Sequence, residues 1–209
     1  MVKKLKLNLI RNKFKEEELY VFSPFDLQKY FNVSKNTASL FLTRNVKKNN
    51  IIKLRKGLYI FSGEHINEML IANKVCQPSY ISFEYALMFY NIIPETVYPI
   101  TSATSKITKE FIIENITYSY YRIKKEAFVG YKKEDFNGQS ALIAEQEKAF
   151  VDYLYFVDLR KKVLYSRIDV SNLSRDKLIK YAKLFKRKSL LNLTNKIYDQ
   201  ARRHKKIIY

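Results

Sequence analysis

The sequence predicts an α+β protein of two domains, and three observations support this prediction. Apolar residues recur at helical spacing in several segments, whereas short runs rich in Ile, Val, Thr and Tyr are typical of strands. The length of 209 residues suits a small domain followed by a larger one. A junction at Ser62-Gly63 separates a compact helical pattern from a longer, less regular region. We therefore expect one domain over residues 1–62 and another over residues 63–209.

Capping residues mark the expected helices of the first domain. A first helix should lie within about Lys3–Lys15. Ser23-Pro24 offers a hydroxyl cap followed by proline at the first helical position, and the helix that starts there should stop at Asn32-Val33. Ser34 is a fresh cap, so a further helix is expected from about Lys35 to Lys48.

Two β-rich runs follow these helices. Ile51–Leu54 and Leu58–Phe61 flank the turn Arg55-Lys56-Gly57, whose glycine can adopt positive φ. Three helices with a short turn between the last two, followed by a β-hairpin, is the order of a winged helix-turn-helix. The sequence therefore predicts this DNA-binding module at the N-terminus. The alternative is an arbitrary basic helical hairpin followed by a β-turn.

Positive charge is concentrated at both ends of the chain. The formal net charge is +19, made up of +10 over residues 1–61, −4 over residues 62–158 and +13 over residues 159–209. The composition, rich in Lys, Asn, Ile and Tyr, is typical of an AT-rich genome, but codon bias alone would spread lysine evenly. A field of this sign attracts polyanions, nucleic acid first and an anionic membrane surface second.

The predicted DNA-reading surface is the stretch from Ser34 to Lys56, which has seven Lys or Arg residues and no Asp or Glu. A helix that is merely solvated usually mixes charges of both signs. On the helix from Lys35, the residues Ala38, Phe41, Leu42 and Val46 share an apolar face that should pack inward. The residues then left to bind double-stranded DNA are Ser34, Lys35, Asn36, Thr37, Ser39, Thr43, Arg44 and Lys47, with Arg55 and Lys56 at the tip of the wing.

The second domain is expected to mix helices and strands and to end in basic helices. Helices are predicted over Glu64–Val75, from the Ser82 cap to Tyr90, over Glu145–Asp158, after the Ser174 cap and over about Ser189–Arg203. Strands are predicted over Val97–Thr101, Ile116–Arg122, Ala127–Tyr131 and Ala141–Ala144. The basic C-terminal helices would add phosphate contacts, or would simply present a solvated basic face.

Signals of metal, cofactor or enzyme chemistry are weak. His65 and His204 are the only histidines, and neither has a Cys or carboxylate at metal-ligand spacing. The sequence contains neither the carboxylate–any residue–lysine pattern of nucleases nor the Asp-x-Asp pair of nucleotidyltransferases, and it has no glycine-rich phosphate loop. We therefore expect no metal, no cofactor and no enzymatic activity.

One cluster could carry catalysis: Glu145, Glu147, Lys148 and Asp152. In the ordinary interpretation, the two glutamates lie in the first turn of a helix, where the helix dipole favours negative charge. Lys148 and Asp152 would then form an i,i+4 pair on the domain surface.

The cysteine content and the hydropathy pattern indicate the cellular compartment. Cys76 is the only cysteine, so no internal disulfide can form, and we expect it to be a small buried residue in a reducing cytoplasm. No apolar run approaches the roughly 20 residues that a membrane span needs. The protein is therefore expected to be soluble and cytoplasmic.

Several segments resemble one known family. Val33–Ala38 and Leu54–Tyr59 resemble the N-terminal winged helix of the AbiEi-type antitoxins, which belong to AbiE abortive-infection, or type IV toxin–antitoxin, systems. Pro78–Leu87, Tyr98–Ser102 and Ala141–Asp152 are similar to strand and helix motifs of that family's second domain. The segments occur in the family's order and cover roughly residues 20–160.

The resemblance implies a transcriptional repressor that binds inverted repeats in its own promoter. Its second domain would counter a nucleotidyltransferase-like toxin without forming a stable complex with it, as part of phage defence. The absence of Asp-x-Asp fits an antitoxin rather than a toxin. Two alternatives stay open: a stand-alone regulator whose second domain senses a ligand, and a nucleic-acid enzyme that uses Glu145, Glu147 and Asp152.

Overall fold

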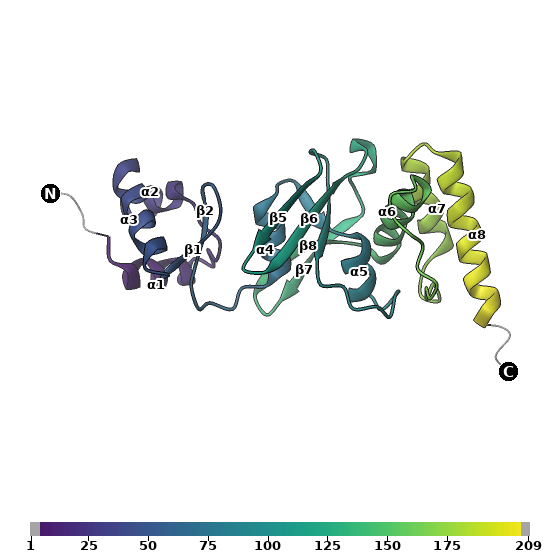
Figure 1. Cartoon of the computed structure of the whole chain (residues 1–209), viewed down its shortest axis with the longest axis horizontal. Coiled ribbons are helices and arrows are strands. Elements are labelled where there is room, and N and C mark those ends of the chain that lie inside the picture. Colours follow the sequence, from purple (N-terminus) through teal and green to yellow (C-terminus); the bar gives the residue numbers. More distant parts are fainter. Residues whose placement is uncertain (1–4, 206–209) are drawn as a thin grey trace. The chain divides into compact units, whose positions relative to one another are not determined.

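The protein has a mixed α+β fold with eight α-helices and two sheets among the residues that the structure describes (Figure 1). The computed structural model describes the backbone of residues 5–205 and the side chains of residues 5–201. The chain divides into two compact units, Met1–Asn67 and Glu68–Tyr209. This division lies a few residues beyond the junction predicted at Ser62-Gly63.

Unit 1 consists of three helices followed by a two-stranded antiparallel sheet. Its elements are α1 (Leu7–Glu16), α2 (Pro24–Phe31), α3 (Lys35–Lys47), β1 (Ile51–Arg55) and β2 (Leu58–Phe61). Every one of these elements contributes to a single apolar core, because each element presents one apolar side. The buried core residues are Ile10, Phe14, Phe22, Leu27, Ala38, Leu42, Ile51 and Phe61.

Side-chain caps set the ends of α2 and α3, as the sequence predicted. The backbone N–H of Asp26 donates to Ser23 Oγ at 3.3 Å, and the backbone N–H of Ser23 donates to Asp26 Oδ2 at 2.7 Å, which completes a capping box. Asn32 ends α2 in the left-handed region at φ 48°. The backbone N–H of Thr37 then donates to Ser34 Oγ at 3.2 Å and starts α3. Local chemistry alone therefore fixes the three-residue connection between the helices.

The hairpin of unit 1 is tied to the start of α2. Strands β1 and β2 pair with Ile51 opposite Phe61. At the turn, Gly57 has φ +80°, a conformation that other residues rarely adopt. On the other side of β2, Phe22 and Tyr59 exchange two backbone hydrogen bonds of 2.9 Å. These bonds hold the hairpin against the helical core.

Unit 2 is built on a six-stranded mixed sheet with the strand order β5-β6-β4-β3-β8-β7. Its strands are β3 (Ser79–Ile81), β4 (Ile100–Thr104), β5 (Lys109–Ile113), β6 (Ile116–Arg122), β7 (Tyr131–Phe136) and β8 (Gln139–Ala144). Its helices are α4 (Glu68–Val75), α5 (Phe83–Phe89), the 3-10 turn η1 (Lys125–Ala127), α6 (Gln146–Asp158), α7 (Arg175–Leu184) and α8 (Lys188–Lys205). The pairs β4/β6 and β3/β8 are parallel, and the remaining neighbours are antiparallel.

Helix α6 is the centre of the helical part of unit 2. It contacts α5, α7 and α8, which lie around it in Figure 1. Nine of its thirteen residues are buried. Helix α4 contacts β3, β4 and β8, so it covers the sheet separately. Among the described residues, no helix combines the length and the apolar character needed to cross a membrane.

Several predicted boundaries in unit 2 were wrong. The helix expected from Glu64 begins at Glu68. The strand expected over Val97–Thr101 begins at Ile100, since Pro99 lacks the N–H that a ladder needs. Of residues 127–131, expected to form a strand, only Tyr131 does, as the first residue of β7; Ala127 ends η1, and Gly130 interrupts the extended backbone with φ +76°.

Two strands, β3 and β5, were not predicted at all. Every residue of β3 is buried, so its three residues show no alternation of polar and apolar side chains. β5 is an edge strand with mostly exposed side chains, so its sequence lacks the continuous apolar run of a buried strand.

Cys76 is buried, as expected.

Candidate nucleic-acid interface

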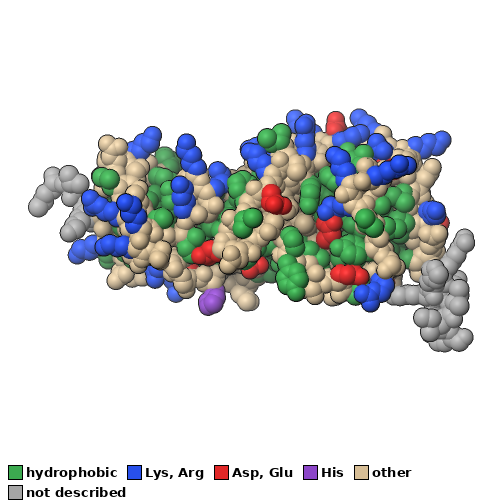
Figure 2. All heavy atoms as spheres, viewed as in Figure 1, with side chains coloured by type: hydrophobic (Ala, Val, Ile, Leu, Met, Phe, Trp, Pro, Cys, Tyr) green, Lys and Arg blue, Asp and Glu red, His purple; other side chains and the backbone are tan. Residues whose placement is uncertain are grey.

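The predicted DNA-binding residues lie on the accessible surface of unit 1. Nine of the ten are exposed, and Thr37 is half-buried. They are Ser34, Lys35, Asn36, Thr37, Ser39, Thr43, Arg44 and Lys47 at the start of α3 and along it, with Arg55 and Lys56 at the hairpin turn. In Figure 2, blue lysine and arginine side chains are spread over the visible face of this unit.

Ser34 and Thr37 have a structural role as well. Their hydroxyl oxygens lie 3.0 Å apart, and the backbone N–H of Thr37 donates to Ser34 Oγ. The Ser34 oxygen thus satisfies one of the free N–H groups at the start of α3. Any contact that these two residues make with DNA must coexist with the cap.

The two sides of α3 differ sharply in polarity. Ala38 and Leu42 are fully buried, and Phe41 and Val46 pack against the same core while remaining half-buried. The opposite side carries Asn36, Leu40, Thr43, Arg44 and Lys47, which are spaced so that they share one face of a helix. Among the described residues, neither Arg44 nor Lys47 forms an ion pair. This face therefore offers donors and positive charge to a ligand.

Leu40 is the residue of this face that the sequence analysis missed. Its side chain is 56% exposed although leucine is apolar. It lies one turn after Asn36 and one turn before Arg44, in the middle of the polar side. Helical spacing could have identified it. Position 40 is two residues from the core residue Ala38 and therefore lies on the opposite side of the helix from the inward-facing apolar residues.

The acidic residues of unit 1 all lie outside the stretch from Ser34 to Lys56, and three of them are held by other groups. Glu17 pairs with Lys13 at 2.7 Å, and Asp26 belongs to the α2 capping box. Glu64 pairs with Arg11 at 3.6 Å. The segment from α3 to the hairpin therefore presents uncompensated positive charge.

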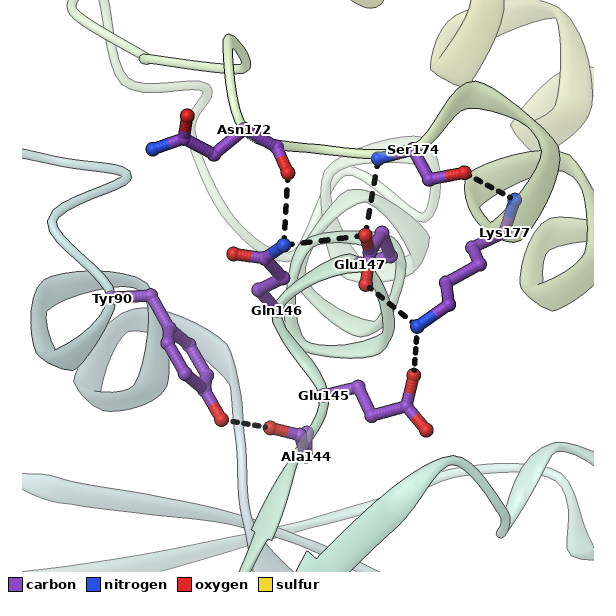
Figure 3. A network of polar contacts seen from close by, with 8 residues as sticks. All are labelled: Tyr90, Ala144, Glu145, Gln146, Glu147, Asn172, Ser174 and Lys177. Carbon is purple, nitrogen blue, oxygen red and sulfur yellow. Dashed lines mark hydrogen bonds and ion pairs between the residues drawn. The ribbon is translucent and has the colours of Figure 1, made fainter.

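The two glutamates of the possible catalytic cluster connect α6 to α7 (Figure 3). Lys177 Nζ lies 2.9 Å from Glu145 Oε2 and 3.9 Å from Glu147 Oε2. Glu147 Oε1 also accepts a hydrogen bond of 3.0 Å from the backbone N–H of Ser174, the N-cap of α7. The hydrogen bond from Lys177 lowers the pKa of Glu145 below its usual value. Both carboxylates thus anchor the start of α7.

Lys148 and Asp152 form the expected pair, but the prediction of a surface position was wrong. Both side chains are fully buried, and the Lys148 ammonium contacts Asp152 Oδ1. The other oxygen, Oδ2, accepts hydrogen bonds from Tyr80 Oη at 2.9 Å and from Ser82 Oγ at 2.8 Å. Ser82 therefore binds Asp152 and makes no side-chain cap for α5. Burial raises the pKa of Asp152 and lowers that of Lys148.

These contacts divide the cluster into two separate groups. Glu145 and Glu147 face Lys177, whereas Asp152 faces Lys148, Tyr80 and Ser82. Within the described part of the chain, no group of three His, Cys, Asp or Glu side chains is placed to hold a metal ion.

The basic C-terminal helices are partly neutralised within unit 2. Arg187 Nε lies 2.6 Å from Asp158 Oδ2, and Arg175 lies 3.5 Å from Asp199. Lys177 is held by Glu145 and Glu147. Lys180, Lys183 and Lys188 are exposed. The net charge of residues 159–209 is therefore larger than the positive charge that this segment can offer to a partner.

Neither a protein-family model nor a curated protein matches the chain.

Proposed function

We propose that this protein is a DNA-binding regulator and that unit 1 is its winged helix-turn-helix. One observation carries the proposal: α3 is buried on one side and presents an exposed, acid-free donor face on the other. A helix of this kind fits the major groove of B-DNA, which is about 12 Å wide. In this proposal α3 is the recognition helix and the β1–β2 hairpin is the wing.

The chemistry of the face suggests a division of roles. Asn36 offers an amide suited to bidentate contact with adenine, and Arg44 a guanidinium suited to guanine. Lys47, Arg55 and Lys56 are placed toward the end of α3 and at the turn, where they would contact phosphates. Phosphate contacts give affinity for any sequence, whereas base contacts give selectivity.

At a finer level, we propose an AbiEi-type antitoxin that represses its own promoter through inverted repeats and counters a nucleotidyltransferase-like toxin without a stable complex. The resemblance is supported by the place of its motifs in unit 2. The segment Pro78–Leu87 supplies Tyr80 and Ser82, and Ala141–Asp152 supplies Asp152, so the motifs meet in one buried hydrogen-bond network. Motifs that a family shares because they stabilise its fold would be expected to contact one another in this way. We further propose that the protein acts by binding and is not an enzyme.

DNA binding is tested by selecting sites from a random duplex library with the full-length protein, followed by gel shifts on the selected duplex. The triple variant Asn36→Ala, Arg44→Ala, Lys56→Ala removes two positive charges and should lose most of its affinity, at about 1–3 kcal/mol for each base contact. A matched control, Lys109→Ala with Lys180→Ala, removes two charges from unit 2 and should bind as the native protein does. Unchanged binding by the folded triple variant would refute the assignment.

The antitoxin proposal is tested in cells that express the protein and the product of a neighbouring nucleotidyltransferase-like gene from unrelated promoters. The triple variant should lose repression of a promoter reporter while still rescuing colony formation when the toxin is induced. If a folded triple variant fails to rescue, protection depends on DNA binding and the division between the two units is wrong.

A further inference from the structure

Unit 2 contains a pocket that the proposed DNA-binding role does not use. Its volume is about 430 Å³, and it is lined by Ser105, Arg122, Ile123, Lys124, Lys125 and Tyr155. Three of these six residues are cationic and none is acidic. The pocket lies wholly within unit 2.

The sheet explains why these residues meet. Strands β4 and β6 are parallel, with Thr104 opposite Arg122, so both strands end at the same edge. Ser105 directly follows β4, and Lys124 follows the end of β6 by two residues. Ligands of open sheets bind in the crevice beyond the carboxyl ends of parallel strands. Residues far apart in sequence therefore lie together at this end of the two strands.

The side chains of the pocket are set to donate. Lys124 Nζ is held by a hydrogen bond of 2.6 Å to the backbone oxygen of Phe185, and the Tyr155 ring lies 4.4 Å from that of Phe185. Arg122 and Lys125 are exposed, and within the described residues neither side chain has an ion-pair partner. A guanidinium, two ammonium groups and two hydroxyls supply many more donors than acceptors.

We propose that this pocket binds the phosphate group of a small phosphorylated molecule. A dianion with several oxygens matches a set of cationic donors better than a single carboxylate does, and guanidinium groups bind phosphate in bidentate fashion. The volume falls within the range of small-molecule sites and exceeds what phosphate alone requires. The half-buried Tyr155 adds an aromatic surface for the organic part. The inference depends on unit 2 alone and holds whether or not unit 1 binds DNA.

If this site is occupied in the cell, unit 2 acts as a sensor of a phosphorylated metabolite. Such a role corresponds to the alternative of a regulator with a ligand-sensing second domain. The geometry of the pocket is the specific observation that favours it.

The test is a titration of the full-length protein with inorganic phosphate at fixed pH, with sodium chloride at matched ionic strength as the reference. Backbone amide NMR signals of Ser105, Arg122, Lys124 and Lys125 should shift and saturate with phosphate only. The variant Arg122→Gln with Lys125→Gln should weaken phosphate binding by about tenfold or more. The control Lys180→Gln with Lys196→Gln removes the same charge from exposed positions on α7 and α8 that do not line the pocket. It should change the affinity less than about twofold, because salt screens exposed charges.

Three outcomes would overturn the proposal. The first is the absence of saturable shifts in the native protein, which requires no variant to fold. The second is equal weakening by both double variants, which would mean that phosphate responds only to net charge. The third outcome uses a 12-nucleotide single-stranded DNA without a terminal phosphate as the probe. If the native protein binds this DNA, the Arg122/Lys125 variant does not, and inorganic phosphate fails to displace it, the pocket binds a nucleic-acid backbone instead.

Discussion

The carboxylate of Asp152 on α6 accepts a hydrogen bond of 2.9 Å from the Tyr80 hydroxyl on β3, in a region where both side chains are fully buried. Ser82 and Lys148 complete the surroundings of the same carboxylate. One acidic group therefore connects the central helix of unit 2 to the sheet and to the start of α5. Its removal would leave a buried ammonium without a counter-charge.

We accordingly expect Asp152→Ala to destabilise unit 2 by about 3–5 kcal/mol, the usual cost of an uncompensated buried charge. The double variant Lys148→Met with Asp152→Leu removes both charges and should lose less. Urea unfolding followed by circular dichroism measures both. Lys196→Ala, at an exposed site on α8, is the control. If Asp152→Ala lowers the free energy of unfolding by less than about 1 kcal/mol, the buried pair does not stabilise unit 2 as proposed.

A second prediction concerns the pH response of the contact between Glu145 and Lys177. The pKa of Glu145 is lowered in the folded protein, so the contact stabilises the fold above the ordinary carboxyl pKa. That stability is lost as the pH falls through the lowered, folded-state pKa. In Lys177→Gln, the pKa of Glu145 should rise toward its usual value, as measured by carbon NMR of the side-chain carboxyl. An unchanged pKa would show that Lys177 does not act on Glu145.

The capping role of Ser34 can be separated from its proposed role in DNA binding. Ser34→Ala should cost about 1 kcal/mol of stability, because the first turn of α3 loses its acceptor. Ser34→Asp restores an acceptor but places a carboxylate on the acid-free face. We expect Ser34→Asp to be nearly as stable as the native protein yet to bind DNA more weakly. Urea unfolding measures the stability of the two variants, and gel shifts measure their affinity for DNA. The prediction is contradicted if Ser34→Ala and Ser34→Asp have the same stability and the same affinity.

Leu40 is expected to contribute to sequence selectivity. An exposed apolar side chain among donors can contact the methyl group of thymine in the major groove. Leu40→Ala should leave stability nearly unchanged, since the side chain is 56% exposed, while lowering affinity for the selected site. Replacing single thymines by deoxyuridine should weaken the native protein at one position and have no effect there on Leu40→Ala. Equal losses in both proteins would remove Leu40 from the interface.

The sequence predicted the elements that local chemistry determines. The caps at Ser23 and Ser34, the end of α2 at Asn32 and the turn at Gly57 all depend on residues close to one another in the chain. The same holds for the polar face of α3, because core and surface positions follow from helical spacing alone.

Features that depend on distant residues were not predictable in this way. An i,i+4 pair such as Lys148 and Asp152 looks the same in sequence whether it is exposed or buried, and its burial depends on Tyr80 and Ser82. β3 has three buried residues and no alternation to reveal it. The pocket lined by Ser105, Arg122 and Tyr155 requires β4 and β6 to be neighbours in the sheet, which no local pattern indicates.

The central claim, that α3 and the hairpin bind the phosphates and bases of duplex DNA, is tested most directly by the salt dependence of affinity for the selected duplex. The logarithm of affinity falls with the logarithm of salt concentration by about 0.9 for each phosphate that is neutralised. The variant Lys47→Gln, Arg55→Gln, Lys56→Gln should therefore show a slope shallower by roughly two to three. The same slope and the same affinity as the native protein would contradict the account.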